Sequence, residues 1–303
     1  MDYDKPIKIA EDIYWVGYYN TKMDIQANPY LIIDNDEAIL IDPGSVLDFE
    51  IVKRKVESLI DLKKIKYIIL NHQDPDIASS TTLFEKKLNK DLLIICHWRT
   101  YVLVRFYGII SKFYNVNENN YEITLKSGRK IEFIESPYLH FPGAIMTYDA
   151  KSEILFSSDI FGSFSEKWEL YANKNYYETM LSFHEHYMPG NEYLRPIMDK
   201  LDFYKIKIIA PQHGSVINKE VRKYIRGLRD LECGSFLDKI KINSNIVTSM
   251  KDILTKIIKR YISLVGDDKV IKVLEYLNIK TDKEMTVVDY NHNDIDIWDL
   301  FEV

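Results

Sequence analysis

Hydrophobic residues recur along the chain in short runs with two kinds of spacing. Continuous runs of Val, Ile, Leu, Tyr and Phe that end in Gly, Pro or Asp are typical of buried strands. They predict strands in residues 13–19, 28–34, 37–45, 66–76, 91–97, 121–136, 153–162 and 206–216. Apolar residues at helical spacing, such as Ile51, Val52 and Val56, predict helices. These helices lie in residues 46–64, 81–90, 100–113, 218–238, 253–266 and 269–278.

Strands that alternate with helices indicate a layered α/β or α+β protein in which helices cover the sheets. The pattern weakens in residues 239–250, which are polar and are expected to be irregular. We therefore predict two parts: a domain in residues 1–245 and a mainly helical C-terminal extension in residues 246–303.

Composition limits the class of protein. With 46% hydrophobic and 28% charged residues, the chain is typical of a globular protein. The 40 basic and 46 acidic residues give a net charge of −6, which argues against nucleic acid as the main partner. Cys96 and Cys233 lie in apolar or helical surroundings and are expected to be reduced thiols. We see no secretory signal and no run long enough for a membrane helix, so a cytoplasmic protein without a membrane partner is expected.

Several predicted strands end in side chains that bind metals. These residues are His72, Asp74, Asp76, His140, Asp159 and His213. Three imidazoles and three carboxylates can serve two cations, and one Asp can bridge the pair. The motifs contain no Cys, so the set suits iron, with zinc or manganese as alternatives. The share of carboxylates favours iron, because anionic oxygen stabilises the ferric state.

Each motif taken alone has a simpler interpretation. A His at a strand end is more often a structural residue, and Asp74 and Asp76 could cap the helix that follows them. Four such motifs in order, each after an apolar strand, favour the metal site.

The same segments resemble the flavodiiron proteins of the metallo-β-lactamase superfamily. The run His72-Gln73-Asp74-Pro75-Asp76-Ile77 resembles the family motif H-x-E-x-D-H. The runs SPYLHFPG, LFSSDIFG and APQHG resemble the segments that carry the remaining ligands. The resemblance covers about residues 5–240 and implies an αββα metallo-β-lactamase fold with two iron ions joined by an oxide or hydroxide.

The resemblance also implies a role for each residue. His72, Asp74 and His140 would bind one iron, Asp76 and His213 the other, and Asp159 would bridge them. Two positions depart from the family. Asp74 stands for a longer Glu, and Ile77 stands for the final His and cannot coordinate. The second metal would then have an open position or a donor from elsewhere, or its site would be weak.

A third departure bears on function. Flavodiiron proteins continue into a flavin-binding domain, and the stretch after Asp238 is too short for one and has no phosphate-binding loop. The chain thus resembles flavin-free relatives that bind oxygen in spirochaete chemotaxis. We expect a protein that binds O₂ or NO and acts as an oxygen sensor with a signalling partner. Any slow oxidoreductase activity would need an external electron donor.

Two further readings stay open. A zinc-dependent hydrolase of the glyoxalase or lactonase kind would use a metal-bound water as nucleophile. A catalytically idle signalling adaptor is the other. Whether this chain forms the homodimer of the family that it resembles is also left open.

Other residues are candidates for support around the metals. These are Tyr176, His184, His186 and Ile77. For Tyr176 a packing role is at least as good an interpretation. His97 is expected to be structural and His292 solvated, and residues 291–303 are expected to dock on the protein itself or on a partner.

Overall fold

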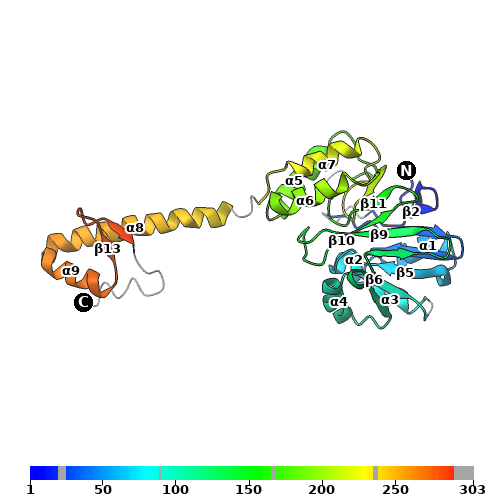
Figure 1. Ribbon diagram of the computed structural model, residues 1–303, viewed down its shortest axis with the longest axis horizontal. Helices are drawn as coiled ribbons and strands as arrows, with labels where there is room; N and C mark the ends of the chain where they lie inside the picture. Colours follow the sequence, from blue (N-terminus) through cyan, green and yellow to red (C-terminus); the bar gives the residue numbers. More distant parts are fainter. Residues whose placement is uncertain (20–24, 89, 165–167, 235–237, 290–303) are drawn as a thin grey trace. The chain divides into compact units, whose positions relative to one another are not determined.

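The computed structural model describes residues 1–19, 25–88, 90–164, 168–234 and 238–289 (Figure 1). The expectations for His292 and for residues 291–303 concern residues outside these ranges. The chain divides into two compact units, Met1–Ser235 and Phe236–Val303. In the described part of the chain, no helix combines the length and the apolar character that a bilayer crossing requires.

The first sheet has seven strands in sequence order. They are β1 (Ile7–Ala10), β2 (Ile13–Trp15), β3 (Tyr30–Asp34), β4 (Glu37–Ile41), β5 (Ile65–Ile69), β6 (Leu93–Cys96) and β7 (Lys112–Asn115). Strands β1 to β4 are antiparallel, and β4 to β7 are parallel. Parallel neighbours need crossover connections. These contain α1 (Phe49–Glu57), η1 (Leu62–Lys64), α2 (Pro75–Ala78), α3 (Thr81–Glu85), α4 (Trp98–Val104) and η2 (Arg105–Tyr107).

The second sheet has five strands in the order β12-β11-β10-β9-β8. They are β8 (Glu122–Thr124), β9 (Lys130–Glu135), β10 (Ile145–Asp149), β11 (Ile154–Phe156) and β12 (Ile208–Ala210), with η3 (Val116–Glu118) before them. Only the β11–β12 pair is parallel. The helices of this half are α5 (Tyr176–Tyr187), α6 (Asn191–Leu201) and α7 (Val221–Arg229).

Three apolar clusters hold the layers of the first unit together. The cluster between the sheets includes Trp15, Ile41 and Phe156. A second cluster joins the outer face of the first sheet to α1, α3 and α4. A third joins the outer face of the second sheet to α5, α6 and α7. Figure 1 shows these two groups of helices on opposite sides of the paired sheets. The predicted αββα sandwich is confirmed.

A buried ionic contact joins the two sheets through Arg129. Its guanidinium donates to both carboxylate oxygens of Asp149, at 3.1 and 2.5 Å, and lies 3.8 Å from Asp34. The Asp149 side chain is 0% exposed, so Arg129 is placed to offset the cost of burying a carboxylate there.

The second unit contains α8 (Asp238–Val265), α9 (Asp267–Tyr276), β13 (Lys280–Thr281) and β14 (Val287–Asp289). Its small core includes Leu254, Ile258 and Leu274. The boundary between the two compact units follows Ser235. The sequence predicts a boundary after residue 245, which lies within α8 in the structure.

Two predictions of secondary structure were wrong, one of a helix and one of an irregular stretch. The helix expected over residues 218–238 ends at Arg229, and Gly234 then takes a φ of 95°, which a helix cannot continue through. The stretch 239–250 was expected to be irregular but is helical within α8. Its Asn and Ser residues each cost only ~0.5 kcal/mol in a helix, which a long helix tolerates.

Candidate metal centre

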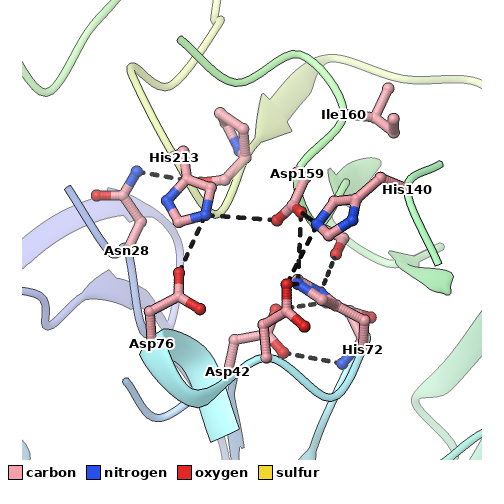
Figure 2. Close-up of polar contacts among 12 residues, drawn as sticks. Asn28, Asp42, His72, Asp76, His140, Asp159, Ile160 and His213 are labelled. Atoms are coloured by element: carbon pink, nitrogen blue, oxygen red, sulfur yellow. Dashed lines mark hydrogen bonds and ion pairs between the residues drawn. The ribbon is translucent and has the colours of Figure 1, made fainter. Parts of the chain in front are cut away.

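The segments that carry the predicted ligands meet at one edge of the sandwich. His72 follows β5, His140 lies between β9 and β10, Asp159 follows β11, and His213 follows β12. The start of β10 pairs with the ends of both β9 and β11, so these segments end on the same side. Figure 2 shows the side chains converging there.

One group of donors surrounds the first half of the site. His72, Asp74, His140 and Asp159 each offer one ligand atom, and these atoms lie within 4.8 Å of one another. His140 Nε2 lies 2.7 Å from Asp159 Oδ2 and 3.3 Å from Asp74 Oδ2. His72 Nε2 lies 3.4 and 3.5 Å from the same two oxygens. This spacing fits donors that share one cation.

Asp159 also faces a second group through its other oxygen. Its Oδ1 lies 3.5 Å from His213 Nε2, and His213 Nε2 lies 3.2 Å from Asp76 Oδ2. Figure 2 shows Asp159 between His213 on one side and His72 and His140 on the other. A carboxylate in this position can bridge two cations.

Two buried polar atoms at the centre of the cluster lack a hydrogen-bond partner among the described residues. His72 Nε2 and Asp159 Oδ1 form no hydrogen bond of acceptable geometry with any described residue. Both residues are 2% exposed, so water from the bulk does not satisfy these atoms. Buried polar atoms in native proteins almost always have a partner. A pair of metal ions between the groups would provide it, and the residues present therefore fit a dimetal centre.

The carboxylates change the ionisation of the imidazoles beside them. Burial opposes protonation of His140, but hydrogen bonds to Asp159 and Asp74 outweigh it and raise its pKa to about 10. Burial likewise opposes protonation of His213, but Asp76 and Asp159 raise its pKa to about 9. The same contacts overcome burial and hold the pKa of Asp74 and Asp159 well below the usual range. The cluster therefore attracts positive charge strongly.

Two of the imidazoles are oriented through their second ring nitrogen. His72 Nδ1 lies 2.8 Å from Ser158 Oγ, and His213 Nδ1 lies 2.9 Å from the Gln26 carbonyl oxygen. In each case an Nδ1–H can donate, which leaves Nε2 free to bind a cation. Ser158 has a φ of 56°, uncommon for a residue other than Gly.

The loop that carries His213 is held by Asn28, which is 0% exposed. Asn28 Nδ2 donates to the carbonyl oxygens of Pro211 and Gly214 at 3.1 and 2.8 Å, and its Oδ1 accepts from Trp15 Nε1 at 2.8 Å. The Tyr30 hydroxyl also donates to Pro211 O, at 2.8 Å. Sequence reasoning missed this role, because it treated Asn28 only as the beginning of a strand.

A second network that sequence reasoning missed supports the His72 segment. Asp42 accepts from the backbone N–H and side-chain amide of Asn71 at 2.8 and 2.7 Å, and Asn71 Oδ1 accepts from Thr147 at 2.8 Å. Burial raises the pKa of Asp42 to about 6, although the bonds from Asn71 oppose the rise. The usable signal was the position of Asp42, at the end of an apolar strand like the ligands.

Tyr176 and His184 anchor the segment after Asp159. The Tyr176 hydroxyl donates to Phe161 O at 2.7 Å and accepts from Ser215 N at 3.0 Å. It thus ties the Asp159 loop to the His213 loop. His184 Nε2 accepts from Phe161 N at 3.1 Å, and burial lowers the pKa of His184 to about 4.

The remaining candidates contribute less. His186 is exposed on α5, and its Nδ1 lies 2.8 Å from Ser182 O. Ile77 is fully buried in the apolar cluster between the first sheet and its helices. His97 caps α4 by accepting from Arg99 N through Nδ1 at 3.2 Å, a structural role as expected.

A cleft of about 520 Å³ opens onto the donors. The residues that line it include the donors Asp74, Asp76 and His213 and the apolar or aromatic Val46, Leu47, Phe183 and Tyr187. None of the described residues that line it is Lys or Arg. The described side chains of the cleft are therefore carboxylates, imidazoles and uncharged groups.

Two facing sheets, covered by helices and carrying a His and Asp cluster at one edge, place the chain in the metallo-β-lactamase fold class. The profile of the family described as "ODP family beta lactamase" matches residues 25–214, and the chain belongs to this family.

Several relatives are known in more detail. A solved structure titled "Peroxy diiron species of chemotaxis sensor ODP" is 28% identical, with a TM-score of 0.66 over 78% of this chain and 98% of that one. The apo state of the chemotaxis sensor ODP from T. denticola is 26% identical, with a TM-score of 0.64 over 78% of this chain and 97% of that one. The nitric oxide reductase of Moorella thermoacetica is 26% identical over 247 residues, which is 73% of this chain and 60% of that protein. The chain spans 36% of a putative diflavin flavoprotein of Synechocystis, so it covers only part of such curated relatives.

Proposed function

We propose that this protein holds two iron ions and binds O₂ or NO there as a sensor. The observation that carries the proposal is Asp159, whose two oxygens face separate donor groups while its buried Oδ1 lacks a hydrogen-bond partner. The proposal is supported by family membership and by relatives whose titles name a diiron species, a chemotaxis sensor and a nitric oxide reductase.

In this proposal each donor has one task. His72, Asp74 and His140 would hold the first iron, Asp76 and His213 would hold the second, and Asp159 would face both. A ferrous pair, when bound, supplies the electrons that activate a diatomic ligand. Ser158 and the Gln26 carbonyl keep two of the imidazoles oriented for it.

Ile77 limits the number of protein donors on the second iron. Its side chain is apolar and packs in the cluster behind the site, so it supplies no ligand. Of the proposed set, Asp76, Asp159 and His213 would hold the second iron, and a diatomic ligand would reach it through the cleft.

The hydrolase alternative is not favoured. Three carboxylates in the donor set suit iron better than a zinc centre dominated by imidazole.

We also propose a cytoplasmic protein that passes the state of its centre to a signalling protein. Any oxidoreductase activity would be slow and would depend on an external electron donor. The absence of a basic charge excess supports a partner other than nucleic acid.

The test is anaerobic purification of the full chain, iron loading with metal quantification, and optical titration with O₂ and with NO. We expect two irons per chain and a new absorption band with each gas. An Asp159→Ala variant should lose both the iron and the band. Loaded protein that shows no spectral change with either gas would refute the proposal.

A further inference from the structure

Helix α4 and the turn η2 expose an unusual set of apolar side chains. Trp98, Val102, Leu103, Phe106 and Ile110 are 43%, 44%, 42%, 83% and 88% exposed, respectively. We call these five residues the α4 surface. Figure 1 shows α4 at the margin of the first unit. Scattered apolar residues are normal on surfaces, but five large ones within such a short stretch mark an interaction site.

The charges in this stretch of the chain have one sign, although the carboxylate of Glu85 lies beside its end and accepts from Ile110 N at 3.1 Å and from Ser111 N at 3.0 Å. Residues 92–117 contain no Asp or Glu, although the whole chain carries a net charge of −6. Arg99, Arg105 and Lys112 lie in this stretch and are exposed. Each arginine lies over an aromatic ring, Arg99 at 5.2 Å from Trp98 and Arg105 at 5.4 Å from Tyr101. Aromatic residues and Arg, without acidic residues, are typical of protein interfaces.

The same element contacts both segments that carry the first group of donors. The Tyr107 hydroxyl donates to Gln73 O at 2.8 Å, between His72 and Asp74. Thr100 Oγ1 donates to Gly143 O at 3.0 Å, in the turn that follows His140. This turn packs closely, because a Cβ on Gly143 would lie 2.7 Å from Arg99 Cβ and 3.0 Å from Thr100 N. These contacts connect both donor segments directly to α4 and η2.

We propose that the α4 surface binds a partner protein through a segment of apolar side chains flanked by carboxylates, with an affinity set by the state of the metal centre. Only the dependence of the affinity on the metal centre rests on the proposed function; the binding of the partner does not. Charge complementarity decides the occupant. A second copy would bring its own arginines to the contact, and like charges disfavour that pairing.

The contacts favour a protein over a lipid surface. Arg99 Nη1 donates to Pro142 O at 3.4 Å, so this guanidinium is held in place rather than free to follow phosphates. Binding that depends on the centre must also be reciprocal, so the partner would change the affinity of the centre for its own ligand.

The probe for the test is a synthetic helical peptide of about 18 residues, which spans about five turns, with Leu and Trp on one face and Glu elsewhere. A second peptide carries Lys in place of Glu. Fluorescence anisotropy measures the binding of each to the full chain. We expect the acidic peptide to bind at least about tenfold more tightly than the basic one, a difference of about 1.4 kcal/mol. Arg99→Glu combined with Arg105→Glu should invert this preference, and Phe106→Ala should weaken binding about tenfold or more.

Coupling is tested with the same peptide on iron-free, reduced iron-loaded and O₂-exposed protein. The affinity should differ between the last two states by at least about threefold, or ~0.7 kcal/mol. Tyr107→Phe combined with Thr100→Val should abolish that difference while the wild-type preference for the acidic peptide remains. If the wild-type affinity is the same in all three states, coupling is refuted. The preference for the acidic over the basic peptide is measured on iron-free protein and does not depend on O₂ binding. Failure of the proposed function would therefore show only in the optical titration, and failure of the surface assignment only in the peptide binding.

Three other results would overturn the surface assignment. Equal binding of both peptides would remove the charge argument. Sedimentation with anionic phospholipid vesicles, lost in Phe106→Ala, would assign the surface to a membrane. A dimer of the full chain that Phe106→Ala dissociates would assign it to a second copy. Circular dichroism of each variant, compared with the wild type, separates these results from unfolding.

Discussion

Asn28 is expected to contribute more to the free energy of unfolding of this protein than the size of its side chain indicates. It is fully buried, and its side chain forms three hydrogen bonds that connect Trp15 to the loop carrying His213. In Asn28→Ala all three are lost, while the backbone bond from Asn28 N to Gln212 O, at 2.8 Å, remains.

The cost can be worked out bond by bond. Pro211 O keeps a bond from Tyr30 at 2.8 Å, and Gly214 O keeps one from Trp168 Nε1 at 2.7 Å, so each loss there costs only ~0.5–1 kcal/mol. The Trp15 indole N–H loses its partner in a buried place, at ~1–3 kcal/mol. The expected destabilisation is therefore about 2–5 kcal/mol.

Asn28→Asp should be worse than Asn28→Ala at neutral pH. Asp is isosteric with Asn, but a carboxylate oxygen would replace Nδ2 and face two carbonyl oxygens, at positions now 2.8 and 3.1 Å away. A buried charge without a donor costs several kcal/mol more than a lost hydrogen bond.

Urea unfolding of the iron-free chain, followed by tryptophan fluorescence, measures both variants. Tyr148→Phe is the matched control, since it removes one bond to Lys205 O (2.8 Å) and should cost about 1 kcal/mol. Titration with Co²⁺ then tests the site: the second equivalent should weaken more than the first. The reasoning is refuted if Asn28→Ala costs no more than the control, or if both equivalents weaken equally.

Three further outcomes are expected. Asp76→Ala should lose one of two bound metals and Asp159→Ala both, as measured by metal analysis after dialysis; equal losses would contradict the bridging role. His184 is neutral in the folded chain because burial lowers its pKa to about 4. As the pH falls below 6.5, the unfolded chain therefore binds a proton at this residue before the folded chain does, and the free energy of unfolding decreases between pH 6.5 and pH 4. The loss approaches about 3 kcal/mol, and His184→Gln should flatten this part of the stability curve of the iron-free chain; an unchanged slope would show that another group is responsible. Arg129→Met should cost about 3–5 kcal/mol in denaturant unfolding because it leaves the buried Asp149 carboxylate without its cationic partner, and a cost below 1 kcal/mol would contradict this.

The positions of the donors could be read from the sequence because the signal is local. An apolar run that ends in His or Asp marks both a strand and its end, and the ends of β5, β11 and β12 lie at one edge of the sandwich. The six predicted side chains accordingly lie close together in the structure. The weak fit of Ile77 was also visible, because its side chain has no donor atom whatever its surroundings.

The support around the donors could not be read in this way. Asn28 and Pro211 are 183 residues apart in the chain, and their hydrogen bond forms only when folding brings them together. Ser158 is next to a predicted ligand, yet its bond to His72 depends on a backbone conformation with positive φ that Ser rarely adopts. Such partners depend on the packing of two sheets, which no local pattern of residues contains.

Charge balance explains why the centre needs cations at all. Asp159 is nearly fully buried, and Asp74 and Asp76 face the same space, so three carboxylates repel one another there. Without a metal, the compensating charge among the described donors is a proton on an imidazole: the carboxylates raise the pKa of His140 to about 10 and that of His213 to about 9, and against the effect of burial they also raise the pKa of His72. A metal must displace those protons, because a protonated Nε2 cannot coordinate. The carboxylates that raise the imidazole pKa values thus also make a divalent ion the better occupant, since one such ion neutralises two charges where a proton neutralises one.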